Sequence, residues 1–83
     1  MRSEFEAVMT RKRFCDAVGI HATTLRRWEQ AGHVNPVRQS VLGIETMVFE
    51  DEDVKAAKRA AKLLASHPGV LSVSEAFRRA RGS

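Results

Sequence analysis

Hydrophobic residues recur with a helical period through residues 11–31. After Thr10, a suitable N-cap, the segment RKRFCDAV predicts a helix over about residues 11–18. Its apolar side holds Phe14, Cys15 and Val18, and its polar side holds Arg11, Lys12 and Asp16. Gly19 accepts the left-handed conformation of a tight turn, Ile20 is an apolar plug, and a second helix is predicted from His21 through Ala31, ending at Gly32. Two helices joined by such a short glycine turn have the spacing of a helix-turn-helix.

The pattern changes after Gly32. The segment HVNPVRQSVLGIETMVF contains Pro36 and Gly43 and has no sustained helical period. It predicts two short strands, at about 37–41 and 46–49, joined by a turn around Gly43. A hairpin that follows a helix-turn-helix is a wing.

Two more amphipathic segments predict helices. EDEDVKAAKRAAKLLASH opens with carboxylates, which favour a helix N-terminus, and stops at His67-Pro68-Gly69. We expect its apolar stripe to be Val54, Ala57, Ala61, Leu64 and Ala65. Ser72 and Glu75 match a Ser-x-x-Glu capping box that opens a fourth helix through about Arg81. Its core-facing residues are predicted to be Val73, Ala76, Phe77 and Ala80.

The predicted fold is mainly α with a small β-hairpin wing. We expect a single winged helix-turn-helix domain over residues 1–83, with about four helices. Its parts are the helix-turn-helix at about 10–32, the wing at about 36–49, the third helix at about 51–66 and the fourth at about 72–81.

The second helix sorts its side chains onto two opposed faces. One face gathers Leu25, Trp28 and Gly32, with Glu29 at the margin, and the other gathers Thr23, Arg26, Arg27 and Gln30. An arginine fork can bond guanine or bridge phosphates, glutamine can read adenine, and threonine can bond a phosphate or touch a thymine methyl. The alternative is a solvated face in which Arg26 pairs with Glu29 or Gln30. Trp28 could stack on a base, but its spacing from Leu25 favours a core role.

Charge points to a polyanionic partner. The chain has 14 Lys and Arg against 10 Asp and Glu, a formal net charge of +4, which suits nucleic acid or an anionic membrane surface. Arg11, Lys12 and Arg13 are candidates for phosphate contacts, because the first helix of this motif lies across the DNA backbone. For Arg78, Arg79 and Arg81, phosphate contact and a solvated face remain equal alternatives.

The sequence gives no sign of a catalytic or metal centre. Cys15 has no cysteine partner, and the three histidines are widely spaced without ligands nearby. No nucleophile stands at a recognisable spacing from a base, so we expect neither an enzyme nor a cofactor. No apolar run reaches the roughly 20 residues of a membrane span, and no secretory leader is visible, so we expect a soluble cytoplasmic protein associated with the nucleoid.

The residues TRKRFCDAVGIHATTLRRWEQAGHVNPVR resemble the DNA-binding head of the MerR-like winged-helix superfamily. The matching positions are Thr24, Leu25, Arg26, Trp28, Glu29, Gly32, Pro36 and Arg38. TLRRWEQAG is also similar to excisionases and other small MerR-like proteins of phages and mobile elements. The resemblance spans roughly residues 10–80, including FEDEDV and VLSVSEAF. It implies a recognition helix in the major groove, with Arg26 and Arg27 on bases or backbone and the wing on phosphates or the minor groove.

The chain departs from the family in two places. Regulators of this family commonly end the wing with Arg-x-Tyr, whereas this chain has Met47 and Phe49, with Glu45 nearby. Phe49 keeps the aromatic packing, but the missing arginine leaves Arg38 as the best wing candidate. Full regulators also continue into a coiled-coil helix and an effector-sensing region. These 83 residues contain neither, so we expect no small-molecule ligand.

Three functions stay open. The first is a sequence-specific double-stranded DNA-binding protein, a bacterial or phage MerR-like transcriptional regulator or its DNA-binding domain. Its candidate contacts are Thr23, Arg26, Arg27, Gln30, Arg38, Arg11, Lys12 and Arg13. The second is an excisionase, DNA-packaging or chromosome-organising factor, and binding as a homodimer or as a cooperative array is open for both. The third is a protein-interaction module that uses the apolar wing residues Val41, Leu42, Ile44 and Met47.

Overall fold

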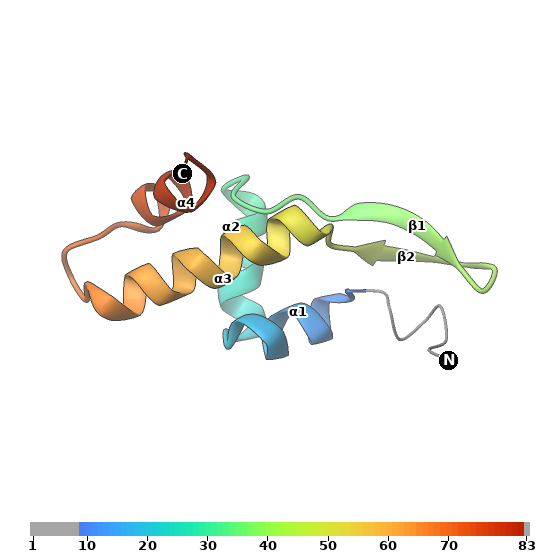
Figure 1. The fold of residues 1–83 in the computed structure, drawn as a ribbon. Coiled ribbons are helices and arrows are strands. Elements are labelled where there is room, and N and C mark those ends of the chain that lie inside the picture. The colour runs from blue at the N-terminus through green and yellow to red at the C-terminus, as the bar shows by residue number, and fades with distance from the viewer. Residues whose placement is uncertain (1–8, 83) are drawn as a thin grey trace.

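The fold is a helix-turn-helix followed by a hairpin wing and two packed helices. A computed structural model describes residues 9–82, except for the side chain of residue 41. The elements follow the order α1 (Arg11–Val18), α2 (Ala22–Gln30), β1 (Val37–Val41), β2 (Ile44–Val48), α3 (Asp51–Ser66) and α4 (Val73–Gly82). The predicted mainly helical architecture with a two-stranded wing is confirmed (Figure 1).

Local caps define the first helical pair. The hydroxyl of Thr10 accepts a hydrogen bond from the Arg13 amide at 3.4 Å, which confirms the predicted N-cap. Gly19 ends α1 with a φ of +82°, a left-handed conformation that a residue with a Cβ rarely adopts. The second helix is shorter than predicted at each end, because His21 and Ala31 flank α2 as its caps.

The wing differs from the prediction in its second strand, which begins at Ile44 rather than at residue 46 and ends at Val48. Leu42 and Gly43 both have positive φ, +54° and +79°, and close a two-residue loop. Ile44 therefore pairs directly with Val41. This backbone matches the right-handed twist of the strands, but it usually requires glycine or asparagine at both positions, so Leu42 gave no signal for it.

Helix α3 runs the length of the helical part, with α4 on one side and α1 on the other (Figure 1). Because it is covered from two sides, its buried face is broader than one stripe and differs from the prediction. The buried residues are Val54, Ala56, Ala57 and Ala60. Ala61 and Leu64 are half-buried, and Ala65, predicted to be apolar core, is exposed.

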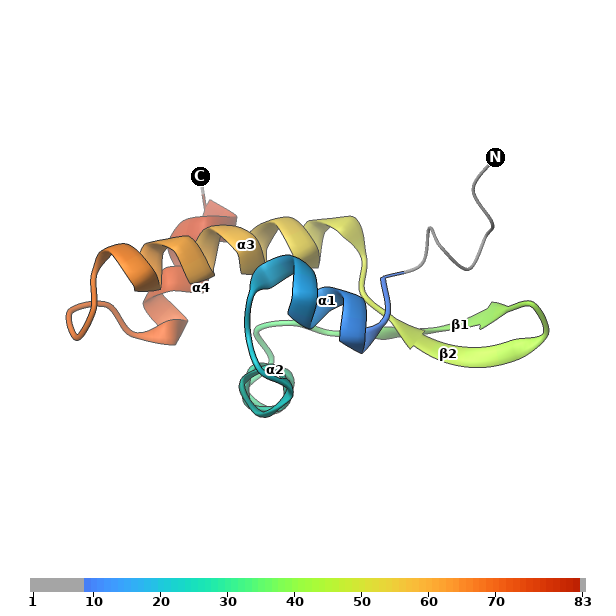
Figure 2. The same cartoon turned by 90° about the horizontal axis from the view of Figure 1, so that it is seen from below.

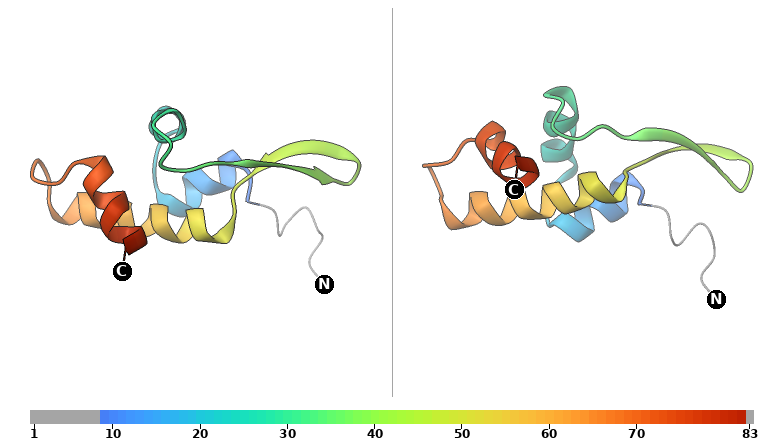
Figure 3. Two further views of the ribbon diagram at one scale, coloured as in Figure 1. Left: turned by 90° about the horizontal axis from the view of Figure 1, so that it is seen from above. Right: turned by 45° about the horizontal axis from the view of Figure 1, so that its top comes forward.

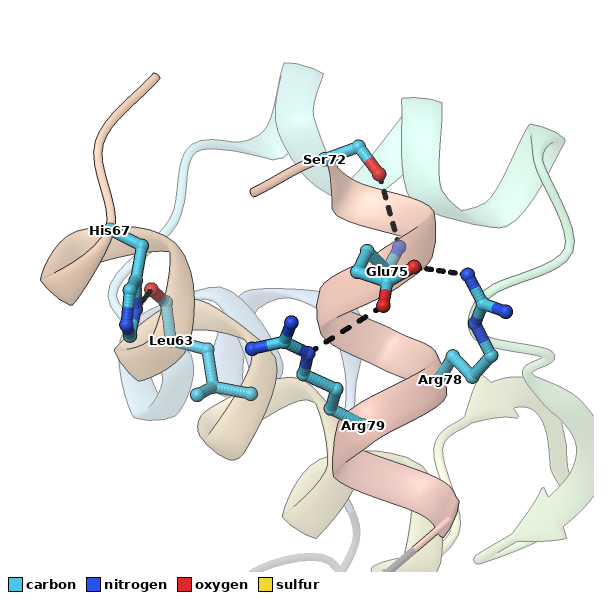
Figure 4. A network of polar contacts seen from close by, with 6 residues as sticks. All are labelled: Leu63, His67, Ser72, Glu75, Arg78 and Arg79. Atoms are coloured by element: carbon cyan, nitrogen blue, oxygen red, sulfur yellow. Dashed lines mark hydrogen bonds and ion pairs between the residues drawn. The ribbon is translucent and has the colours of Figure 1, made fainter. Parts of the chain in front are cut away.

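Helix α4 begins where the sequence predicts. The Ser72 hydroxyl accepts a hydrogen bond from the Glu75 amide at 3.1 Å, and the Glu75 carboxylate pairs with Arg78 and Arg79 (Figure 4). Three of the four predicted core residues, Ala76, Phe77 and Ala80, are buried, and Val73 is half-buried.

Aromatic side chains join the elements into one core. Phe14 of α1 packs against Phe49 after the wing, with ring centroids 4.4 Å apart. Phe77 of α4 forms a T-shaped pair with Trp28 and stacks with His33, with ring centroids 4.9 Å apart in both pairs. Trp28 is 4% exposed, which confirms its predicted core role.

Candidate nucleic-acid interface

The second helix presents its polar face outward. Figure 2 views α2 nearly end-on, at the margin of the molecule and away from α3. Leu25 and Trp28 are buried on the inner side, while Thr23, Arg26, Arg27 and Gln30 are exposed. The predicted division into two faces is therefore present in the fold. Gly32, predicted for the core side, is instead exposed in the turn after the helix, with a φ of +81°.

The two arginines of this face are available to a ligand. Within the part of the chain that the structure describes, neither Arg26 nor Arg27 forms a hydrogen bond or an ion pair. The alternative in which Glu29 pairs with Arg26 is wrong, because Arg11 occupies the Glu29 carboxylate. Two forked donors thus stand in water on one helix face, where an acceptor on a ligand would meet no competing partner.

Arg11 braces α1 against α2. Its guanidinium donates to both oxygens of Glu29, Nη2 to Oε1 at 2.7 Å and Nε to Oε2 at 3.3 Å. This hydrogen bond is the largest influence on the guanidinium and raises the pKa of Arg11 against a smaller desolvation effect. The Glu29 side chain is only 18% exposed, so the pair is partly shielded from water. Arg11 therefore has a structural role, and a phosphate would have to compete with Glu29 for its guanidinium.

A groove between α1 and α2 brings several predicted residues together. It has a volume of about 710 Å³. Among its lining residues are Arg11, Lys12, Asp16, Thr23, Arg26 and Gln30. Lys12 lines the groove from α1, while Thr23, Arg26 and Gln30 line it from α2, so a ligand seated in the groove can contact cations of both helices. Arg27 and Arg13 do not line this groove, although both are exposed.

Two carboxylates lower the positive potential of the groove between α1 and α2. Asp16 and Glu29 both line the groove, and sequence reasoning had assigned neither to the site. Cys15 lines the same groove and is half-buried. Burial is the first cause that raises the pKa of its thiol, and the charges of Asp16 and Glu29 add to it. A higher pKa reduces the fraction of thiolate, the reactive form. Among residues 9–82, no cluster of His, Cys, Asp and Glu could hold a metal ion.

The wing supplies one cation, Arg38. Arg38 stands opposite Met47 in the hairpin register, and its guanidinium lies 3.8 Å from the Glu45 carboxylate. Both side chains are highly exposed, so the pair is worth at most about 1 kcal/mol and can open for a ligand. Both views in Figure 3 show the wing extending past α2 and away from the connection between α3 and α4.

A bracket of polar contacts that the sequence did not predict fixes the wing to the helices. Arg81 Nη2 donates to the His33 carbonyl at 2.7 Å and to Asp53 Oδ1 at 2.8 Å. The other oxygen of Asp53 accepts the Asn35 amide at 2.9 Å. The chain leaving α2 is thus tied to α3 and α4 just before it enters the wing. No local pattern reports these contacts, since Arg81 lies 48 residues from His33 and 28 from Asp53.

The contacts of Arg81 separate its role from those of Arg78 and Arg79, the other residues of the basic cluster on α4. Arg81 is a structural residue, whereas Arg78 and Arg79 pair with Glu75 on the surface of α4 (Figure 4). The predicted alternatives of phosphate contact and solvated face therefore apply only to Arg78 and Arg79.

Comparison with known proteins identifies the helix-turn-helix region. A family model described as MerR HTH family regulatory protein matches residues 9–67, from the turn before α1 to the end of α3. No curated protein and no solved structure matches the chain significantly. Within the described residues, no helix is both long and apolar enough to cross a membrane.

Proposed function

Because the chain belongs to the MerR HTH family of DNA-binding regulatory proteins, we propose that it reads a specific duplex sequence by placing the exposed face of α2 in the major groove. The single observation that carries this proposal is the pair of arginines, Arg26 and Arg27, exposed without a protein partner among the described residues. A surface arginine that serves only solubility can pair with a neighbouring carboxylate. Here Glu29, one turn along the same helix, is bound to Arg11 instead.

Each polar side chain of α2 has a chemical role in this arrangement. Arg26, which lines the groove between the helices, presents a fork that matches the two acceptors of guanine or a phosphate. Gln30 can offer a donor and an acceptor to adenine, and Thr23 can bond a phosphate near the N-terminus of α2. Arg27 can bond a second base or the DNA backbone.

The remaining candidates act on the backbone. Lys12 supplies a point charge from α1, and Arg13 extends the same basic segment. Arg38 reaches phosphates from the wing once its loose pair with Glu45 opens. Arg11 contributes chiefly by fixing the angle between α1 and α2. Backbone contacts of this kind set register and affinity but carry no direct sequence information.

A selection experiment tests the proposal. The protein is incubated with a pool of random duplex DNA at moderate salt, and the retained sequences are read. Selection with the wild-type protein should yield an enriched motif. The Arg26→Ala variant should bind that motif about 5- to 150-fold more weakly, equivalent to the roughly 1–3 kcal/mol of one bidentate base contact. Lys12→Ala should weaken all sequences alike.

The matched control is Lys58→Ala, which removes one positive charge from an exposed position on α3. Its motif and its affinity should stay close to those of the wild type. If Arg26→Ala and Lys58→Ala behave alike, α2 does not read bases. Binding without any motif, and weakened steeply by salt, would favour the architectural alternatives: excisionase, DNA-packaging or chromosome-organising factor. An inverted repeat in the motif would indicate a dimer, and a direct repeat would indicate an array.

A further inference from the structure

The tip of the wing has an unusual conformation and composition. Leu42 adopts a φ of +54° and is 70% exposed, and its neighbour Ile44 is 67% exposed. A leucine with positive φ is strained, and glycine or asparagine would close the same loop more easily. Of the other predicted apolar wing residues, Met47 is half-buried and the side chain of Val41 lies outside the described part of the structure. The exposed apolar tip therefore consists of Leu42 and Ile44.

This tip is poorly suited to DNA. Residues 39–46 contain no lysine or arginine, and Glu45 adds a carboxylate whose side chain is 72% exposed. Arg38 lies 3.8 Å from Glu45, but once Arg38 leaves this pair for a phosphate, Glu45 remains on the tip as a carboxylate that repels the DNA backbone. Apolar side chains with one negative charge instead suit a protein surface that is apolar and positively charged.

Such a surface lies at the other end of the molecule. A groove of about 460 Å³ runs between α3 and α4, with Leu63 and Ala80 among its apolar lining. Its basic lining residues are Arg59, Lys62, His67 and Arg79. Figure 4 shows Leu63 on α3, His67 just after the end of α3, and Arg79 on α4. Figure 1 places the wing and the connection between α3 and α4 at opposite ends of the fold.

We propose that the wing tip of one copy docks into the α3–α4 groove of a second copy, head to tail, when the two copies occupy neighbouring DNA sites. Leu42 and Ile44 would cover the apolar lining, and Glu45 would meet the basic side chains. The two surfaces lie at opposite ends of a molecule whose longest extent is 44 Å, so one chain cannot satisfy its own groove. A contact between two different surfaces can repeat from copy to copy, and copies that follow one duplex are displaced along its axis, so the contact produces an open array rather than a ring.

The contact should matter only on DNA. Two apolar side chains and one carboxylate cover far less than the area of a stable dimer interface, so free chains remain monomers. Neighbouring copies on one duplex are at a high effective concentration, which makes such a weak contact measurable. The array therefore rests on the proposed DNA binding, and the experiments below separate the two.

Site-directed crosslinking tests the contact itself. One protein carries Leu42→Cys and a second carries Ser66→Cys, an exposed position on the groove, and both carry Cys15→Ser. A short bismaleimide should join the two variants in a mixture on DNA, and neither variant to itself. A chain that carries both cysteines should give a ladder beyond the dimer. Replacing Ser66→Cys by Asp16→Cys, on the opposite groove, is the control and should give no product. The proposal would be overturned if the chain with both cysteines gave products that stop at the dimer, or if the mixture gave as much product as the control.

Cooperative binding provides the second test. With its longest extent of 44 Å laid along the DNA axis, a copy would span about 13 base pairs at roughly 3.4 Å per base pair, so duplexes of about 15 and 60 base pairs would hold one copy and several. Leu42→Asn relieves the strain in the loop and removes the apolar tip. It should leave affinity for the short duplex unchanged and lower the cooperativity on the long duplex about tenfold. Unchanged cooperativity would reject the array.

Failure of the proposed function has a different signature. If the wild-type protein does not bind the short duplex, DNA binding is wrong. The crosslinking is then run at high protein concentration without DNA, where a product between Leu42→Cys and Ser66→Cys still supports the contact and its absence rejects it. A charge exchange, Glu45→Lys with Lys62→Glu on the partner, should restore a product that either change alone weakens.

Discussion

Glu29 determines how many cations of the first two helices a polyanion can reach. Its carboxylate holds Arg11 at 2.7 Å, and its position leaves Arg26 without a protein partner among the described residues. Because it is only 18% exposed, its charge acts on the groove through little water. One carboxylate thus fixes the helix pair and lowers the positive potential of the same surface.

Replacing this carboxylate should strengthen DNA binding at the expense of stability. Glu29→Gln frees Arg11 for a phosphate and should make the plot of log affinity against log salt steeper by about 0.9, the contribution of one more phosphate contact. The free energy of unfolding should fall by no more than about 1 kcal/mol, since Arg11 is largely exposed. Fluorescence anisotropy with labelled duplex across a salt series measures the slope.

Asp16→Asn is the control for this change. Asp16 lines the same groove but forms no ion pair within residues 9–82, so its loss removes one negative charge without releasing a cation. We expect somewhat tighter binding at low salt with an unchanged slope. Equal slopes for Glu29→Gln and Asp16→Asn would mean that Arg11 does not reach the backbone.

At the scale of helices and strands, the bounds that adjacent residues determine were the most predictable. Thr10 and Gly19 bound α1, Ser72 caps α4, and the bounds of α3 match the predicted ones, because caps and helix breakers act within one turn. The second strand was misplaced because Leu42 adopts a backbone conformation that its type does not favour. The candidate recognition face on α2 was predictable from helical period alone.

Contacts between distant elements were not predictable. Ala65 was expected in the core because it fits a helical stripe, but the direction of that stripe depends on where α1 and α4 cover α3. The bracket of Arg81, Asp53 and the His33 carbonyl joins residues far apart in sequence, and an arginine near a helix C-terminus has many other uses. One sequence without its relatives carries no signal for such pairs.

The bracket links α4 to the segment that enters the wing. Arg81→Ala removes two hydrogen bonds, one of them to a charged group, and leaves the His33 carbonyl and Asp53 less well satisfied. We expect the free energy of unfolding to fall by about 1–2 kcal/mol, allowing for the partial exposure of Arg81. Urea denaturation measures this loss, and exchange of the Asn35 amide should accelerate because its acceptor Asp53 loses an anchor.

Arg78→Ala serves as the comparison on the same helix. Its partner Glu75 keeps Arg79, and the pair lies on the surface, so the free energy of unfolding should change by less than about 0.5 kcal/mol. A loss as large as that of Arg81→Ala would show that charge on α4, and not the bracket, stabilises the fold.

At the scale of the whole molecule, α4 completes a core that the first three helices leave open. The family match ends at residue 67, yet Phe77 is buried between Trp28 and His33. Removal of a buried phenylalanine alone costs about 3–5 kcal/mol, a large fraction of the stability of so small a protein. The packing of α2 therefore depends on a segment beyond the residues that the family model matches.

A shortened chain tests this dependence. A chain ending at residue 70 should lose cooperative thermal unfolding and bind dye that reports exposed apolar surface, because Trp28 would lose its cover. The full chain with Phe77→Leu should still fold, with a lower midpoint of thermal unfolding. This variant separates the effect of losing one ring from the effect of losing the whole helix. A shortened chain that unfolds cooperatively would show that the first three helices suffice.

The position of Trp28 has a spectroscopic consequence. It is the only tryptophan in a chain without tyrosine, and it lies directly behind the exposed face of α2. Its indole therefore emits at short wavelength while the ring of Phe77 covers it, and the emission moves to longer wavelength when α4 separates. The molecule carries an intrinsic optical probe of α2, so docking, loosening and unfolding of that helix can be followed in solution without a dye.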